Sequence, residues 1–195
     1  MAGITPSQTV GPFFAYGLSP NGEYDWSDLI INNLVTPDVS GERIRIEGRV
    51  TDCDGKPIND ALLEIWQADG EGRYASAGKN ARPNISFKGF GRVGTDGQGN
   101  FAFDTIKPGA VPGPTGDKQA PHIVVAYFSR GLLTHMYTRI YFADEKANDT
   151  DPILTLVPPE RRHTLIAKRQ QRGNVPVYRF DIMLSGDNET VFFDV

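Results

Sequence analysis

Hydrophobic and polar residues alternate along most of the chain from residue 42 onward. In the segment RIRIEGRV, Ile44, Ile46, Gly48 and Val50 fall on one side of an extended chain, and charged residues fall on the other. Successive side chains of a β-strand point to opposite faces, so this pattern is typical of a strand with one buried face. The segment therefore predicts a half-buried β-strand.

The same reasoning predicts six further strands, separated by turns rich in Gly, Pro, Asn and Asp. They are ALLEIWQAD, FAFDTI, HIVVAYFSR, THMYTRIYFA, VYRFDIML and ETVFFDV. The segment KPGAVPGPTGDK is expected to be a loop, because its prolines and glycines sustain neither a helix nor a strand. The segment DCDGKPIND predicts a turn in which Asp52, Asp54 and Asp60 make local hydrogen bonds.

Two segments favour short helices. PPERRHTLIAKRQ begins with prolines that suit a first helical turn, and it directs Leu165 and Ile166 toward a core. WSDLIINNL is the second segment, with Ser27 as its N-cap. Short strands with one or two helices predict an all-β fold, a single β-sandwich domain over residues 41–195. Residues 1–40 are expected to form an irregular arm whose Pro and Phe residues pack against a partner.

Composition and charge narrow the possible partners. The net charge of -4, from 20 basic and 24 acidic residues, argues against binding to nucleic-acid phosphates. The most basic run, ERRHTLIAKRQQR at 160–172, is better explained as the solvated face of a helix. Cys53 is the single cysteine, no secretory leader opens the sequence, and no apolar run approaches the ~18 residues that span a bilayer. These features predict a cytoplasmic protein that does not bind a membrane.

The strand HIVVAYFSR begins with a histidine and ends with an arginine. By alternation, His122, Val124 and Arg130 point to one face of the sheet, whereas Ile123 and Val125 point to the other. A straight strand rises about 3.3 Å per residue, which separates His122 and Arg130 by roughly 26 Å. We therefore expect the two residues to act at different ends of the sheet rather than in one small-molecule site.

Five motifs in a fixed order resemble the intradiol ring-cleaving dioxygenases. They are LEIWQADGEGRY, GFGRVGTDGQGNFAFDTIKPG, APHIVVAYF, TRIYFADE and YRFDIMLSG, and the resemblance runs from TPSQTVGPF to ETVFFDV. It is strongest to the alpha chains of those members that are built from alpha and beta chains. The resemblance implies a β-sandwich core, a catalytic iron(III) held by two tyrosines and two histidines, and cleavage of 3,4-dihydroxybenzoate by dioxygen.

The four iron ligands of the family can be placed on this sequence one at a time. The tyrosines correspond to Tyr74, in GRY, and to Val111, in KPGAVPG; the histidine pair corresponds to His122 and Val124. The arginine that precedes the pair in the family corresponds to Gln119. One phenol and one imidazole make a poor iron(III) site, because valine offers no lone pair. The resemblance thus implies that the iron(III) lies on a homologous beta chain, and that His122 is a remnant, hydrogen-bonded to Tyr74.

The resemblance also assigns a substrate-binding role to the other end of the strand. It implies that Arg130, together with Thr9, Gly11, Pro12 and Phe13 of the arm, lines the active site on the beta chain, in an assembly of several alpha–beta units. A planar cation suits a substrate that carries a carboxylate and becomes a dianionic catecholate. From the residues alone, Arg130 is better explained by a surface ion pair at a hairpin end, and the resemblance reverses this preference.

The remaining candidates carry weaker signals. The segment GFGRVG has glycines in a nucleotide-binding spacing, but no helix follows it. His163 is expected to be solvated among charged residues. The strand THMYTRIYF places four polar side chains on one face, which we interpret as a polar interface rather than a metal site: His135, Tyr137, Arg139 and Tyr141.

Two other functions stay open at this point. A non-catalytic β-sandwich module that binds carbohydrate or protein would share the general strand pattern, although it would not need the Pro- and Phe-rich arm. A self-sufficient homomeric dioxygenase conflicts with Val111 and Val124.

Overall fold

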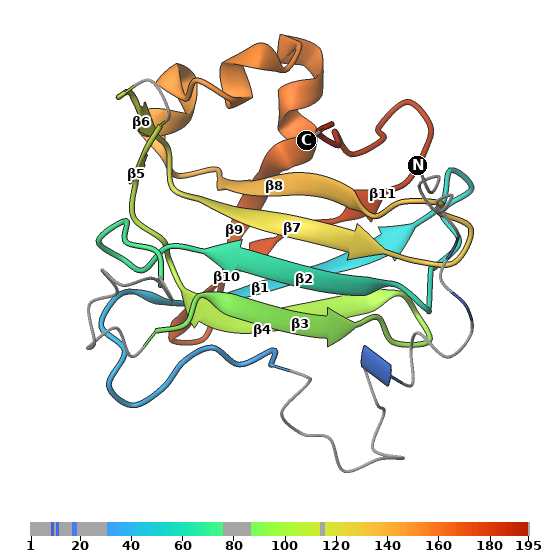
Figure 1. Ribbon diagram of the computed structural model, residues 1–195, viewed down its shortest axis with the longest axis horizontal. Helices are drawn as coiled ribbons and strands as arrows, with labels where there is room; N and C mark the ends of the chain where they lie inside the picture. Colours follow the sequence, from blue (N-terminus) through green and yellow to red (C-terminus); the bar gives the residue numbers. More distant parts are fainter. Residues whose placement is uncertain are drawn as a thin grey trace, which may run out of the picture.

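The computed structural model describes residues 9, 11, 17–18, 31–75, 87–113 and 116–194. In this part of the chain, strands β1 to β8 are followed by three 3-10 helices and then by strands β9 to β11 (Figure 1). The 3-10 helices are η2 (Lys146–Thr150), η3 (Leu154–Leu156) and η4 (Pro159–Leu165). The strands are β1 (Arg43–Thr51), β2 (Leu62–Gln67), β3 (Phe90–Gly94), β4 (Asn100–Ile106), β5 (Val111–Pro112), β6 (Lys118–Gln119), β7 (His122–Phe128), β8 (Met136–Phe142), β9 (Ile166–Arg172), β10 (Val175–Arg179) and β11 (Ile182–Met183).

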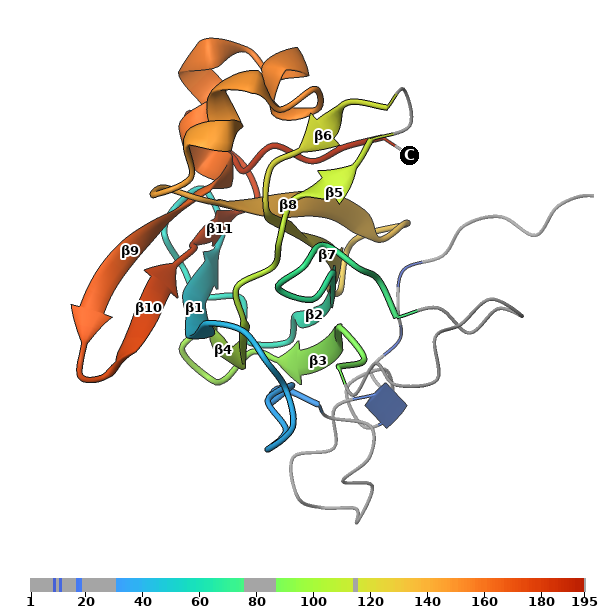
Figure 2. The ribbon, with the colours of Figure 1, turned by 90° about the vertical axis from the view of Figure 1, so that its left-hand side faces the viewer.

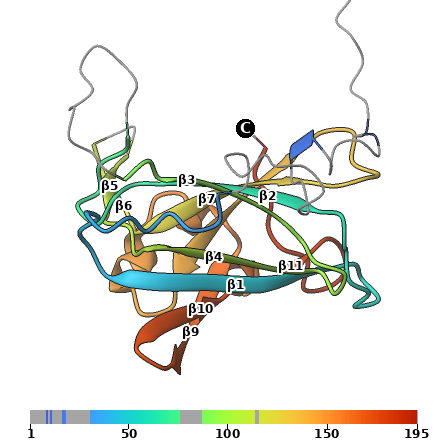
Figure 3. The same cartoon turned by 90° about the horizontal axis from the view of Figure 1, so that it is seen from below.

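The strands form two packed layers. One layer is antiparallel and has the order β3-β2-β7-β8, and the other is built around β1, which pairs with β4, β10 and β11 (Figure 3). A short parallel pairing of β8 with β9 joins the two layers on one side, through Tyr141 with Ile166 and Phe142 with Ala167. The β9–β10 hairpin extends away from the body, and the 3-10 helices lie at the end that carries β5 and β6 (Figure 2). The predicted β-sandwich is confirmed.

Residues 31–34 close the opposite side of the sandwich. The Ile31 carbonyl accepts a hydrogen bond from the Arg92 N–H at 2.9 Å, and the Asn32 carbonyl accepts one from the Asp104 N–H at 2.8 Å. Arg92 lies on β3 and Asp104 on β4, so one extended segment pairs with an edge of each layer. The expected helix over WSDLIINNL is therefore wrong for residues 31–34, and Ser27 lies outside the described residues.

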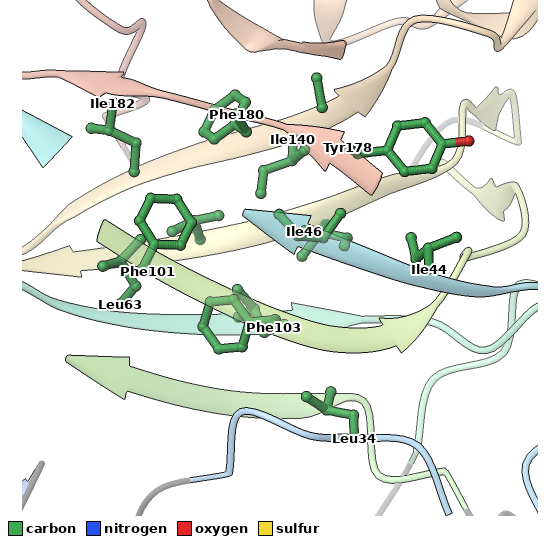
Figure 4. Close-up of a cluster of buried hydrophobic side chains, with 14 of the residues drawn as sticks. Leu34, Ile44, Ile46, Leu63, Phe101, Phe103, Ile140, Tyr178, Phe180 and Ile182 are labelled. Carbon is green, nitrogen blue, oxygen red and sulfur yellow. The ribbon is translucent and has the colours of Figure 1, made fainter. Parts of the chain in front are cut away.

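The core lies between the layers and follows the alternation that the sequence predicts. Ile44, Ile46, Gly48 and Val50 are the buried positions of β1, as expected. Ile44, Ile46 and Val50 pack with apolar residues from both layers in one cluster (Figure 4). A smaller apolar cluster under the 3-10 helices includes Leu165, which was also expected to be buried.

Several predicted elements differ in extent. The helix over PPERRHTLIAKRQ ends at Leu165 as the 3-10 helix η4, and β9 begins at Ile166. The predicted strand VYRFDIML is divided into β10 and β11. The last predicted strand, ETVFFDV, is reduced in its described part to a single bridge between Phe193 and Tyr137. No helix in the described part of the chain is long and apolar enough to cross a bilayer.

Candidate functional site

The sequence resemblance matched four positions to iron ligands, and those on β7 and in the loop after β2 lie near the start of β7. His122 and Val124 lie on one face of that strand, and Val124 is the cross-strand neighbour of Trp66 on β2. Tyr74, in the loop after β2, stacks on Trp66 with ring centroids 6.2 Å apart and planes inclined by 2°. Val111 lies on β5 and is buried. The fold therefore brings Tyr74, His122 and Val124 to one end of the antiparallel layer, and Val111 lies in the separate β5–β6 pair, opposite Gln119.

His122 is a buried, neutral histidine. Its side chain is 4% exposed, and Nδ1 lies 2.8 Å from the Ala120 carbonyl oxygen. A carbonyl oxygen only accepts, so Nδ1 carries the proton and Nε2 is left with a lone pair. Burial lowers the pKa of His122, and the positive charge of Arg139 lowers it further. The hydrogen bond to Tyr74 that we expected is wrong: both residues are described, and the hydrogen bond of the ring runs from Nδ1 to Ala120.

Arg139 occupies the centre of this region, and its role was not recognised in the sequence. It lies on β8 opposite Val124 and donates from Nη1 to Gln119 Oε1 at 2.7 Å. Its guanidinium carbon also lies 5.9 Å from the centre of the Phe193 ring. Burial raises the pKa of Tyr74, and Arg139 opposes that rise through its charge. A cation therefore lies within electrostatic reach of both remaining ligand-type residues.

Asp151 supports the same region from the 3-10 helices and is fully buried. Its Oδ2 accepts a hydrogen bond from the Ala120 N–H at 2.7 Å, next to the carbonyl that holds His122. Its Oδ1 accepts from the Tyr141 hydroxyl at 3.0 Å and from two backbone N–H groups of residues 153 and 154. Burial raises the pKa of Tyr141, so its hydroxyl keeps the proton that it donates. The carboxylate thus ties the segment before β7 to β8 and to η3.

These residues do not fit a ferric ion. Iron(III) is held by several anionic or strongly donating ligands, and Val111 and Val124 supply none. His122 and Tyr74 remain, but the Arg139 charge acts on both and would oppose a trivalent cation. His122 and Tyr74 are therefore too few ligands for iron(III), and the positive charge of Arg139 makes the position unfavourable for a cation.

The other end of β7 forms a second cluster. Arg130 follows the strand in a turn, where its Nε pairs with the Asp60 carboxylate, and its side chain is 68% exposed. The N–H of Gly131 donates to Thr9 Oγ1 at 2.8 Å. The structure thus brings Thr9 beside Arg130, as the sequence resemblance implies, and it also contains the surface ion pair that was the alternative. Gly11 is exposed, whereas Pro12 and Phe13 lie outside the described residues.

The histidines outside β7 form no site with these clusters. His135 lies edge-on to Tyr137, with ring centroids 4.8 Å apart and Nε2 2.9 Å from the hydroxyl oxygen. His163 is exposed on η4, as expected. The GFGRVG segment forms β3 rather than a phosphate loop. Asp52 accepts local backbone hydrogen bonds in its turn, as predicted, whereas the local bonding expected of Asp60 is wrong, since Asp60 pairs with Arg130.

Comparison with known proteins gives consistent matches. A family model described as Dioxygenase matches residues 11–186. The chain is 49% identical to the protocatechuate 3,4-dioxygenase alpha chain of Burkholderia cepacia, over 98% of this chain and 97% of that one. It is 36% identical to the beta chain from the same organism, over 90% of this chain and 77% of that one. The solved dioxygenase domain of a dioxygenase carbohydrate-binding protein fusion from Streptomyces sp. SirexAA-E has a TM-score of 0.64 and 27% identity, covering 93% of this chain and 99% of that one.

Proposed function

Because this chain belongs to the dioxygenase family, we propose that it is the alpha subunit of a protocatechuate 3,4-dioxygenase and that it binds no metal itself. The complex cleaves 3,4-dihydroxybenzoate with dioxygen between the two hydroxylated carbons and forms 3-carboxy-cis,cis-muconate. The observation that carries this proposal is the 49% identity to an alpha chain over nearly the whole of both chains.

The iron(III) of the complex belongs, in this proposal, to a homologous beta subunit. The support is chemical: two of the four ligand positions are Val111 and Val124, and Arg139 places a positive charge beside the other two. The 36% identity to a beta chain is consistent with a pair of similar subunits in which one keeps the metal site. Assembly of several alpha–beta units is part of the same proposal.

This chain contributes substrate binding from the Arg130 end of β7. The exposed guanidinium suits an anionic substrate in a neighbouring pocket, because it offers several N–H donors in one plane. Thr9 accepts a hydrogen bond from the Gly131 N–H, and this contact supports a role for the arm at the same end. We propose that Arg130 and Thr9, with Gly11, Pro12 and Phe13, line the active site on the beta subunit, and that residues 1–40 pack on that subunit while residues 41–195 form the sandwich.

A non-catalytic binding module is not favoured. The family match covers residues 11–186, so it includes the arm as well as the sandwich. Purification from the native cell separates the two functions directly: an alpha subunit travels with an iron-bearing beta chain, whereas a module travels alone.

The site assignment is tested by Arg130→Ala in the alpha–beta complex. We expect kcat/KM for 3,4-dihydroxybenzoate to fall about 10-fold or more, since a charged hydrogen bond to substrate is lost, while the iron content stays unchanged. Arg43→Ala is the matched control, because Arg43 is exposed at the far end of β1 from the β1–β2 turn that bears Asp60. Loss of iron in Arg130→Ala would assign the residue a structural role, and an unchanged rate would remove it from the site.

A further inference from the structure

The Asp60–Arg130 contact joins two turns that are 70 positions apart in the sequence. Asp60 lies in the turn between β1 and β2, and Arg130 lies in the turn between β7 and β8. The Asp60 side chain is 25% exposed, much less than that of Arg130. The carboxylate is therefore the inner partner of the pair, and the arginine is the outer one.

The backbone next to Asp60 is held by hydrogen bonds. The next residue, Ala61, is buried, and its N–H donates to Thr95 Oγ1 at 3.0 Å. The Ala61 carbonyl in turn accepts the Thr95 N–H at 2.9 Å, and Leu62 begins β2. This pairing fixes the backbone on the C-terminal side of Asp60, so the carboxylate offers an acceptor at a defined place.

The backbone beneath Arg130 is also fixed. Ser129 is buried, and Gly131 has φ +85°, a left-handed conformation that residues with a Cβ rarely adopt. The Gly131 N–H is engaged by Thr9. The base of the arginine side chain is thus set by the turn, but its long flexible stem is not, and a further contact is needed to direct the guanidinium.

The contact with Asp60 can direct the guanidinium of Arg130. Asp60 binds the guanidinium through Nε, the donor nearest the stem. Among the described residues, no hydrogen bond engages Nη1 or Nη2. Because the Arg130 side chain is 68% exposed, these two terminal groups are accessible to a carboxylate or catecholate in a second subunit.

We propose that Asp60 is a positioning residue for the ring-cleavage reaction: it orients the Arg130 guanidinium so that Nη1 and Nη2 face the anionic substrate on the partner subunit. This inference rests on the proposed function, since it requires that Arg130 reaches the partner's active site. Asp60 itself touches no substrate. Its removal frees the Arg130 side chain to sample other rotamers, which weakens substrate binding without changing the chemical step.

The test is Asp60→Asn in the assembled alpha–beta complex. Asparagine keeps the size of the side chain but loses the charge, so we expect KM for 3,4-dihydroxybenzoate to rise about 5-fold with kcat within about 2-fold of wild type. Asp60→Glu restores the charge and is expected to recover part of the lost affinity. Asp54→Asn, which changes an exposed carboxylate in the same turn, is the matched control and leaves KM unchanged.

A double-variant cycle with Arg130→Ala separates positioning from general stability. If Asp60 acts through Arg130, then Asp60→Asn has no further effect on KM in the Arg130→Ala background. An equal effect in both backgrounds, or a lowered iron content, would assign Asp60 a structural role and overturn the inference. If Arg130→Ala lowers activity but Asp60→Asn does not, this inference fails and the proposed function stands. If Arg130→Ala has no effect, the role of Arg130 in the proposed function fails as well.

Discussion

Replacement of Asp151 tests how the region at the start of β7 is held together. This buried carboxylate accepts four hydrogen bonds, from the Tyr141 hydroxyl and from the backbone N–H groups of Ala120, Ile153 and Leu154. Asp151→Ala leaves all four donors without this acceptor in a region that water does not reach. Asp151→Asn retains Oδ1 and its three bonds, but places an amide NH2 against the Ala120 N–H.

The expected magnitudes follow from the number of donors that lose a partner. A hydrogen bond to a charged group contributes ~1.5–3 kcal/mol, and a buried donor without a partner costs ~1–3 kcal/mol. These values are not additive, so we expect Asp151→Ala to lower the free energy of unfolding by about 4 kcal/mol. For Asp151→Asn, in which one donor faces another, we expect a loss of about 2 kcal/mol.

Urea unfolding of the purified chain, followed by tryptophan fluorescence, measures both losses. Asp149→Ala is the matched control, because Asp149 is exposed in the preceding 3-10 helix, and we expect it to change stability by less than about 0.5 kcal/mol. If Asp151→Ala and Asp149→Ala unfold at the same urea concentration, the hydrogen bonds of Asp151 do not stabilise the region and the reasoning is refuted. If the Asp151→Ala variant does not fold, the urea midpoint of Asp151→Asn is compared with that of Asp149→Ala instead.

Two further predictions concern the core and the buried histidine. Gly48→Ala is expected to destabilise the chain by about 3 kcal/mol, since a Cβ there would lie 1.7 Å from the Phe180 carbonyl oxygen and 2.6 Å from the Phe101 ring. Gly97→Ala has open space around its Cβ and serves as the control; similar unfolding midpoints for the two variants would contradict the packing argument. Burial lowers the pKa of His122 from its ordinary value of 6.5, so its contribution to stability is present above pH 6.5 and is lost as the pH falls toward the folded-state pKa. Compared with His122→Gln, the native chain should therefore lose more stability between pH 7.5 and pH 5.5. If the urea midpoints of the native chain and the variant fall by the same amount between these two pH values, the prediction is wrong.

The alternation of apolar residues predicted the strands that form the core, but it did not predict those at the edges. β1 and β7 each bury one regular face, and both were predicted close to their observed bounds. β9 was missed because its sequence, IAKRQQR, has no alternating apolar face beyond Ala167. The segment ETVFFDV alternates like a strand, yet Thr164 and Thr138 side chains take the hydrogen bonds of Val191 that a neighbouring strand would otherwise make.

The candidate site was predictable only where motif order could locate it. The sequence resemblance placed Tyr74 and His122, and the fold brings both to one end of the sheet. The contacts that hold the region could not be read from the sequence, because they join distant segments. Arg139 meets Gln119 across 20 positions, and Asp60 meets Arg130 across 70. Each of these side chains, taken alone, is an ordinary polar residue on a strand or in a turn.

Under the proposed function, the contacts at the start of β7 explain how a subunit can lack metal ligands without a defect in its fold. His122 donates from Nδ1 to the Ala120 carbonyl, the Tyr74 ring stacks on Trp66, and Arg139 donates to Gln119, so contacts within the protein hold all three side chains in place. A buried polar group costs free energy only when a hydrogen-bond partner is lacking. The start of β7 can therefore remain packed without a metal, and the strand still extends toward Arg130 at its far end. Under the proposed function, the lack of iron ligands at one end of β7 therefore leaves undisturbed the residue that we propose acts at the other end.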